Sequence, residues 1–228
     1  MSNNLNSSSS SSNENSKIQE SFDKLKRFLN ENDRRVKKGE PFTHGSFEPS
    51  GSYFIKDDKD VIAFQTLYNN CCAHKLNKKN GKNFSLTYVE KPDKYSPLRF
   101  DFDFKASLEY PERQYDYLLV KRIIEIIQSE IKRIVNPHEF KNNILWCILL
   151  EKPLRSEEGK IKDGIHLHFP NCITEMWVSS YLYNQVENRI NDDLLWNGKH
   201  FLEPDNILDK NVNKVNWIMY GSSKGEKK

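Results

Sequence analysis

The sequence predicts a protein of the mixed α+β class, and two kinds of segment among its 228 residues lead to that prediction. Some short segments alternate apolar and polar residues, as strands with one buried face do. Some longer segments repeat apolar residues every three or four positions, as amphipathic helices do. Their order is strand, helix, strand, strand, helix, strand, which is the βαββαβ order of a split ferredoxin-like or RNA-recognition-like sheet with helices on one face.

The elements of this pattern are predicted between residues 98 and 220. The predicted helices span residues 115–135 and 175–192, and the predicted strands span residues 98–105, 143–150, 165–169 and 215–220. A further strand at 85–90 is separated from them by Pro92 and Pro97, which break regular structure. In the βαββαβ order, the first and third strands are neighbours at the centre of the sheet.

The part of the chain before this pattern is predicted to be a separate α/β subdomain, residues 16–95. A capping box at Ser16 to Gln19 begins a helix whose apolar residues recur at helical spacing (Ile18, Phe22, Leu25, Leu29). Residues 1–15 include six consecutive serines and are predicted to be a disordered tail.

Residues 96–224 are predicted to form the RNA-recognition-like subdomain. The remaining residues, 225–228, are expected to be a tail or the point at which a longer protein was cut. No Walker-type phosphate loop occurs in the sequence, so we expect no ATPase activity from this chain.

Composition limits the possible partners. A net charge of +3 permits nucleic-acid binding, but the contact surface would have to be local. The basic cluster of Arg34, Arg35, Lys37 and Lys38 is either a solvated segment or such a contact. The four cysteines have no disulfide-framework spacing and no apolar stretch is long enough for a signal peptide or membrane span, so we expect an intracellular protein without a membrane partner.

The most informative feature is a pair of aspartates, Asp101 and Asp103, in the run from Leu98 to Lys105. Because side chains alternate along a strand, both aspartates share one face and the apolar residues between them share the other. Neighbouring carboxylates repel each other unless a cation lies between them, and oxygen ligands of this kind suit Mg²⁺ or Mn²⁺. The pair is therefore a candidate metal site, although a strand with a solvated polar face shows the same alternation.

The predicted third strand carries a second group of polar residues at alternate positions. Lys162, Gly164, His166 and His168 are expected on the same face as the aspartates, because Ile165 and its apolar neighbours belong to the helix-packed face. Two histidines and a lysine beside a carboxylate pair form a candidate site.

Two further motifs occur near the end of the chain. Asp209 precedes the last predicted strand and is a candidate third carboxylate. Ser222, Ser223 and Lys224 follow Gly221 in a turn that is a candidate phosphate-binding segment.

Together these segments resemble the archaeo-eukaryotic primase superfamily, whose motifs are a hydrophobic-flanked Asp-x-Asp, a small residue-x-His, and a hydrophobic-Asp. Their counterparts in this sequence are Asp101 with Asp103, Gly164 with His166, and Leu208 with Asp209. The resemblance is closest to the N-terminal primase domain of the primase-helicases of nucleocytoplasmic large DNA viruses. The run from Met219 to Lys224 fits a terminal motif of those domains.

The resemblance implies an enzyme that joins nucleotides into primers on a single-stranded DNA template. It implies that Asp101, Asp103 and Asp209 bind two divalent metal ions, Mg²⁺ or Mn²⁺, and that His166 contacts the triphosphate. Lys162 matches a phosphate-binding lysine, whereas Ile218 stands where primase-polymerases carry an arginine. It further implies nucleoside triphosphate substrates, a helicase domain in the full-length protein, and a location in the host cytoplasm or a viral replication compartment.

Two other functions fit parts of the pattern. His166-Leu167-His168 also fits the metal motif of nicking replication initiators, for which Tyr181 or Tyr183 would be the nucleophile. A non-enzymatic RNA-recognition module is the second alternative, but such modules place aromatic residues on the helix-free face, where this chain is expected to place Asp101 and Asp103.

Overall fold

The computed structural model describes residues 8–76, 86–135 and 143–224. The chain divides into two compact units. The terminal unit comprises Met1–Lys91 and Asn216–Lys228, and the central unit comprises Pro92–Val215. The first division lies close to the one predicted after residue 95, but the chain returns to the terminal unit at Asn216.

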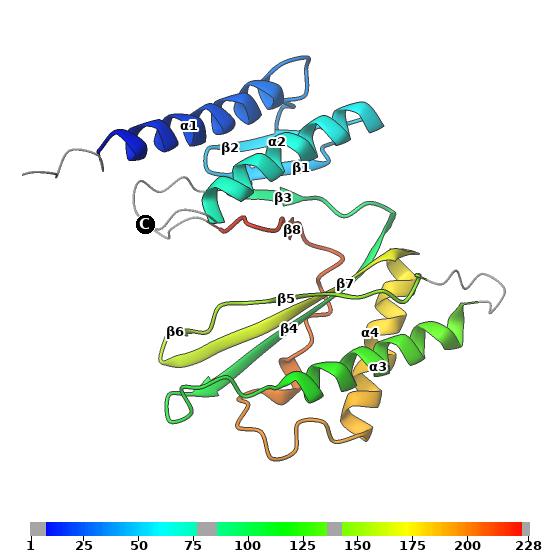
Figure 1. The fold of residues 1–228 in the computed structure, drawn as a ribbon. Coiled ribbons are helices and arrows are strands. Elements are labelled where there is room, and N and C mark those ends of the chain that lie inside the picture. The colour runs from blue at the N-terminus through cyan, green and yellow to red at the C-terminus, as the bar shows by residue number, and fades with distance from the viewer. Residues whose placement is uncertain (1–7, 77–85, 136–142, 225–228) are drawn as a thin grey trace, which may run out of the picture. The chain divides into compact units, whose positions relative to one another are not determined.

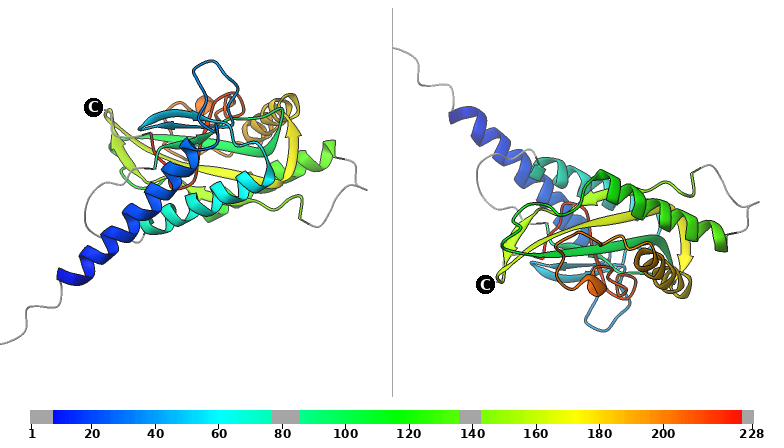
Figure 2. Two further views of the ribbon diagram at one scale, coloured as in Figure 1. Left: turned by 90° about the horizontal axis from the view of Figure 1, so that it is seen from above. Right: turned by 90° about the horizontal axis from the view of Figure 1, so that it is seen from below.

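The terminal unit contains an antiparallel sheet and two helices (Figure 1). Its strands lie in the order β2 (Ser50–Tyr53), β1 (His44–Phe47), β3 (Tyr88–Glu90) and β8 (Trp217–Ile218). Helices α1 (Ser8–Asn30) and α2 (Asp58–Leu76) pack side by side, as both views in Figure 2 show. Helices and sheet share one apolar core, in which the least exposed side chains are Leu29, Cys71 and Leu86.

Helix α1 has the predicted spacing but begins earlier than predicted. Ile18, Leu25 and Leu29 are buried, as their positions on one helical face require. The helix begins at Ser8 and not at Ser16. Extending an existing helix by a few residues costs much less than starting one, so a polar segment without an apolar stripe can continue it. Residues 1–7 of the predicted tail lie outside the described residues.

The central unit is built on one long antiparallel pair of strands (Figure 1). Strand β4 (Tyr95–Ser107) pairs along its length with β7 (Lys160–Glu175), and β7 also pairs with β5 (Ile148–Glu151) and with β6 (Arg155–Glu157). Helices α3 (Tyr117–Ile134) and α4 (Met176–Asp192) pack against each other, and α4 packs on β4 and β7. The predicted adjacency of the first and third strands is confirmed. Within the described residues, no helix is long and apolar enough to cross a membrane.

The last predicted strand lies in a different sheet from the one expected. The predicted segment 215–220 contains β8, which pairs with β3 in the terminal unit, Val89 lying opposite Ile218. Instead, residues 207–209 run along the free edge of β4, where Asp103 N donates to Ile207 O and Asp209 N donates to Asp101 O. Alternation in a two-residue strand shows which face is buried but not which sheet the strand joins, so the sequence could not decide between the two sheets.

The two faces of the β4–β7 pair differ as predicted. Leu98, Phe100, Phe102 and Phe104 are at most 2% exposed on the face that α4 covers, which we call the helix face. Phe100 packs against Phe169 of β7 and Tyr183 of α4. Asp101 and Asp103 lie on the opposite face, which we call the aspartate face.

Candidate functional site

The register of β4 against β7 places the predicted site residues opposite one another. Asp101 pairs with His166, and Asp103 pairs with Gly164. Side chains of directly opposed residues project from the same face of a sheet. The predicted grouping of the aspartates with the Gly-x-His motif is therefore present in the central unit.

A lysine that no motif includes lies between the two carboxylates. Lys152, the residue after β5, places its Nζ 2.6 Å from Asp101 Oδ1 and in contact with Asp103 Oδ1. His166 Nε2 lies 3.5 Å from Asp101 Oδ2. The side chain of Asp101 is 15% exposed and that of Asp103 is 48% exposed, so only the second carboxylate faces solvent broadly.

Each charged side chain of this cluster stabilises the charged form of its neighbour. Burial alone would raise the pKa of Asp101, but the hydrogen bond from His166 and the positive charge of Lys152 hold this pKa below its ordinary value. Burial opposes the charge of Lys152, yet Asp101 and Asp103 raise its pKa above the ordinary value. Asp101 is therefore held as a carboxylate and Lys152 as an ammonium at neutral pH.

Gly164 gives Lys152 its path to the carboxylates. A Cβ on Gly164 would lie 2.9 Å from Lys152 Cδ and 2.4 Å from Phe102 O, and both separations are too short for ordinary contact. Lys152 N donates to Gly164 O at 2.8 Å, which fixes the two backbones side by side. The small residue of the Gly-x-His motif is thus needed because Phe102 O of the neighbouring strand and the aliphatic part of Lys152 both lie against it.

The two histidines of β7 have different environments. His166 contacts Asp101, whereas His168 is opposite Arg99 and Ile148 in the two neighbouring strands. Burial, with the nearby charges of Arg99 and His166, lowers the pKa of His168 to about 4. His168 is therefore neutral at physiological pH.

The backbone brings Asp209 to the edge of the site. Its N–H bonds Asp101 O at 2.9 Å, which places residue 209 beside residue 101 across the edge of the sheet. Its Oδ1 accepts from Asn211 N at 2.8 Å. Within the described parts of the chain, no three His, Cys, Asp or Glu side chains converge closely enough to hold a metal ion.

The predicted phosphate-binding residues lie in two places. Lys162 projects from β7 and its Nζ contacts Glu158 at 2.7 Å and Glu157 at 3.4 Å. Ser222, Ser223 and Lys224 belong to the terminal unit. Ser222 Oγ accepts from Tyr88 N at 2.9 Å and lies 2.8 Å from the hydroxyl of Tyr68. The Ser222 hydroxyl therefore makes its hydrogen bonds within the terminal unit.

Ser223 and Lys224 have exposed side chains. The turn before them contains Gly221 at φ +80°, a backbone conformation that favours glycine. A Cβ there would also lie 2.8 Å from Cys72 Sγ. Both observations explain why this turn requires glycine.

The basic cluster of the terminal unit is not uniformly solvated. The guanidinium of Arg34 makes two hydrogen bonds of 2.8 Å to Asp60 and lies over the ring of Phe28. Arg34 therefore stabilises the terminal unit. Arg35, Lys37 and Lys38 are exposed.

The nicking-enzyme alternative is not favoured by the positions of the tyrosines. Tyr183 is fully buried on the helix face, where its hydroxyl donates to Arg99 O at 2.7 Å, and this burial raises its pKa. Tyr181 is on the same helix, which covers the opposite face of the sheet from His166. Neither tyrosine is placed beside the histidines.

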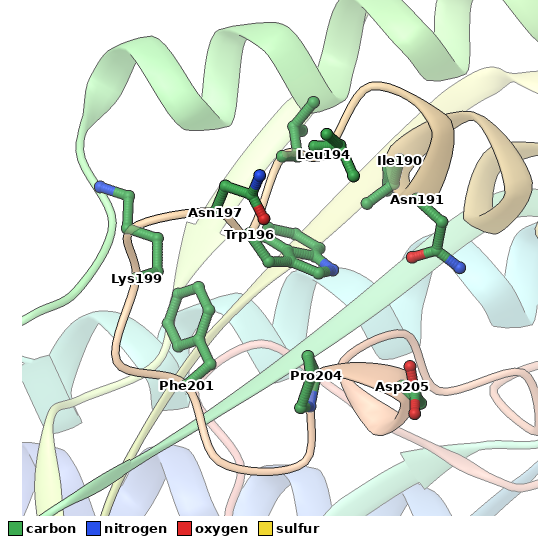
Figure 3. Close-up of a pocket in the computed structure, with 10 residues that line it drawn as sticks. Ile190, Asn191, Leu194, Trp196, Asn197, Lys199, Phe201, Pro204 and Asp205 are labelled. Atoms are coloured by element: carbon green, nitrogen blue, oxygen red, sulfur yellow. The ribbon is translucent and has the colours of Figure 1, made fainter.

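A hollow of about 340 Å³ opens between the end of α4 and the loop that follows it. Figure 3 shows Trp196, Phe201 and Pro204 among the side chains that line it. No predicted site residue lines this hollow. The candidate chemistry therefore belongs to the aspartate face of the sheet.

An α+β fold whose antiparallel sheet sets an Asp-x-Asp strand beside a Gly-x-His strand is the arrangement expected of an archaeo-eukaryotic primase (AEP) domain. Residues 43–228 match the family described as the C962R protein N-terminal AEP domain. Because the match covers most of the chain, the chain belongs to this family.

Two viral proteins are similar to the chain. It is 30% identical over 203 residues to "Putative helicase 184R" of Invertebrate iridescent virus 6, covering 80% of the chain and 20% of that protein. It is 29% identical over 191 residues to "Putative helicase 121R" of Invertebrate iridescent virus 3, covering 78% of the chain and 19% of that protein. The chain thus spans about a fifth of the length of each relative.

Proposed function

We propose that the chain is a DNA-dependent primase-polymerase domain, which joins nucleoside triphosphates into short primers on single-stranded DNA. The observation that carries the proposal is the convergence of Asp101 and Asp103 on one cation position beside His166. Joining nucleotides requires in-line phosphoryl transfer and no protein nucleophile, so rigid carboxylates that hold metal ions are sufficient. Strand β4, paired along its length with β7, supplies that rigidity.

The carboxylate pair fits a divalent metal ion. Both Oδ1 atoms contact the same ammonium nitrogen, which shows that the two side chains can share one cation. Hard carboxylate oxygens suit Mg²⁺ or Mn²⁺. Such ions, when bound, activate the attacking 3′-hydroxyl and neutralise the pyrophosphate leaving group. Asp101 and Asp103 would hold the metal, with Asp209 at the adjoining edge of β4 as the third proposed ligand.

Residues of both units are proposed, each from its own motif, to hold the triphosphate. His166 is fixed beside Asp101 and would donate a hydrogen bond to a phosphate oxygen. Lys162, Ser222, Ser223 and Lys224 remain predicted phosphate contacts. Lys162 would have to leave its ion pairs with Glu157 and Glu158 to make one.

The full-length protein is proposed to be a viral replicative primase-helicase that acts in infected cells. Both relatives are viral, are named as helicases, and are about five times as long as the matched segment. A helicase domain elsewhere in the protein would supply the single-stranded template. Lys105, Lys160 and Lys162, on or beside the aspartate face, are already paired with glutamates. We therefore expect the isolated chain to bind single-stranded DNA weakly and in a strongly salt-dependent way.

The proposal is tested by primer synthesis on single-stranded DNA with nucleoside triphosphates and Mg²⁺ or Mn²⁺. Asp101→Asn and Asp103→Asn should each lower the rate by about a hundredfold or more, because each removes a charge that stabilises the transferring phosphate through the metal. Asp205→Asn is the matched control, since Asp205 is exposed in the same unit away from the pair. Undiminished synthesis by either site variant would contradict the proposal, as would metal-dependent nicking without synthesis.

A further inference from the structure

Lys152 occupies the position that the proposed metal ion needs. Its Nζ lies 2.6 Å from Asp101 Oδ1 and contacts Asp103 Oδ1 as well. Mg²⁺ binds carboxylate oxygens at about 2.1 Å, so an ion held by the same two oxygens would lie within about 1 Å of this nitrogen. Two cations cannot share that position.

The placement of Lys152 is fixed by the fold. Its backbone N–H bonds Gly164 O, and its side chain crosses Gly164, where a Cβ would lie 2.9 Å from Cδ. The side chain is 25% exposed, so the ammonium is partly withdrawn from water in the pair with Asp101 and Asp103. A partly buried ion pair of this kind leaves an uncompensated charge when one partner is removed.

We propose that Lys152 is a displaceable counter-ion that couples metal binding to nucleotide binding. Without metal, its ammonium neutralises the repulsion between Asp101 and Asp103. A divalent ion at the same oxygens displaces the ammonium, which then binds a phosphate oxygen of the incoming nucleotide. This inference rests on the proposed function, because it assumes that the carboxylates bind the catalytic metal.

The displacement agrees with the charges and with the flexibility of the lysine side chain. A divalent ion brings twice the charge of an ammonium to the same two carboxylates, and its attraction to them is correspondingly larger. The lysine side chain has four flexible carbons, so the ammonium can move while the backbone hydrogen bond to Gly164 O keeps residue 152 in place. A free ammonium beside a metal site is suited to bind phosphate as a point charge.

The test compares Lys152→Met with the matched control Lys105→Met. Lys105 lies two residues after Asp103 on the same strand face and pairs with Glu203, so its loss removes the same charge without changing the carboxylate pair. Three quantities are measured for each protein: Mn²⁺ affinity by calorimetry without nucleotide, the thermal unfolding midpoint without metal, and the affinity of a non-hydrolysable nucleotide with saturating Mn²⁺.

The proposal predicts that Lys152→Met binds Mn²⁺ about tenfold more tightly, because the metal no longer competes with the ammonium. The variant should unfold at a lower temperature without metal and recover when Mn²⁺ is added. It should bind nucleotide about fivefold to tenfold more weakly, since one charged contact to phosphate is lost. Lys105→Met should match the wild-type protein in all three measurements.

Lys152→Arg provides a second variant that keeps the positive charge and should fold without metal. It should retain Mn²⁺ affinity close to that of the wild-type protein. Unchanged or weaker Mn²⁺ binding by Lys152→Met would overturn the counter-ion role, and unchanged nucleotide binding would overturn the phosphate role. Tighter Mn²⁺ binding by Lys152→Met together with no primer synthesis by the wild-type protein would overturn the proposed function while leaving the counter-ion role standing.

Discussion

The two faces of strand β4 have different roles: the helix face belongs to the apolar core, and the aspartate face holds the candidate site. On the helix face, Phe100 and Phe102 are fully buried, and Phe100 packs against Phe169 of β7 and Tyr183 of α4. On the aspartate face, Asp101 and Asp103 hold Lys152, and Asp101 also contacts His166. Successive residues of one strand thus alternate between stabilising the fold and forming the candidate site, so substitutions on the two faces should have separable effects.

The largest expected effect on stability comes from the helix face. Phe102→Ala should lower the free energy of unfolding by about 3 to 5 kcal/mol, because it removes a fully buried aromatic ring and leaves a cavity. Asp103→Asn, one residue along, should change that free energy by less than about 1 kcal/mol, since its carboxylate is 48% exposed. Denaturant unfolding of both variants checks the contrast, and similar losses would contradict the separation of the two faces.

A smaller effect is expected from His168, which is on the aspartate face but is largely buried. Its pKa is lowered from 6.5 to about 4 in the folded protein, mainly by burial. Between these pH values the unfolded chain binds more protons, so the free energy of unfolding falls as pH falls through this window. The loss from this residue should reach roughly 3 kcal/mol, at about 1.4 kcal/mol per pKa unit.

The free energy of unfolding, measured at neutral pH and at about pH 4.5, checks this prediction. His168→Gln should show a shallower decline in the free energy of unfolding than the wild-type protein, because glutamine does not titrate. An equally steep decline in the variant would show that other groups cause the pH dependence.

The smallest of these effects distinguishes the two histidines in catalysis. His166→Ala should lower the rate of primer synthesis or weaken nucleotide binding by about tenfold, the worth of one charge-assisted hydrogen bond. His168→Ala should change both quantities less at neutral pH, because His168 is neutral there and lies opposite Arg99 and Ile148, whereas His166 lies opposite Asp101. Steady-state kinetics with varied nucleotide concentration measures both, and a larger effect from His168 would mean that the motif has been assigned to the wrong histidine.

Much of the central unit could be predicted because its signals are local. Alternation from Leu98 to Lys105 correctly assigned each side chain to a face, and the spacing of apolar residues located α3 and α4 to within two residues at each end. The βαββαβ order then placed the first strand beside the third, and the structure adds the register that sets Asp101 opposite His166. These predictions needed only periodicity and connection rules.

The parts that could not be predicted depend on contacts between distant segments. The sequence does not show that residues 207–209, and not 215–220, lie along β4. Lys152 was missed because it follows the end of β5. It nevertheless lies on the same face as Ile148 and Leu150, because side chains at every second position of a strand share a face. The sequence also does not show that the Ser222 hydroxyl bonds Tyr88 and Tyr68, which lie more than a hundred residues away in the sequence. The phosphate contact of Ser222 stays a prediction.

The central claim is that Asp101 and Asp103 share a divalent metal ion, and anomalous diffraction from crystals grown with Mn²⁺ and a non-hydrolysable nucleotide tests it most directly. The account predicts a manganese peak about 2.2 Å from carboxylate oxygens of both residues, with the Lys152 ammonium moved from its present contacts toward a phosphate. Density that retains Lys152 between the carboxylates, with manganese absent or bound elsewhere, would contradict it.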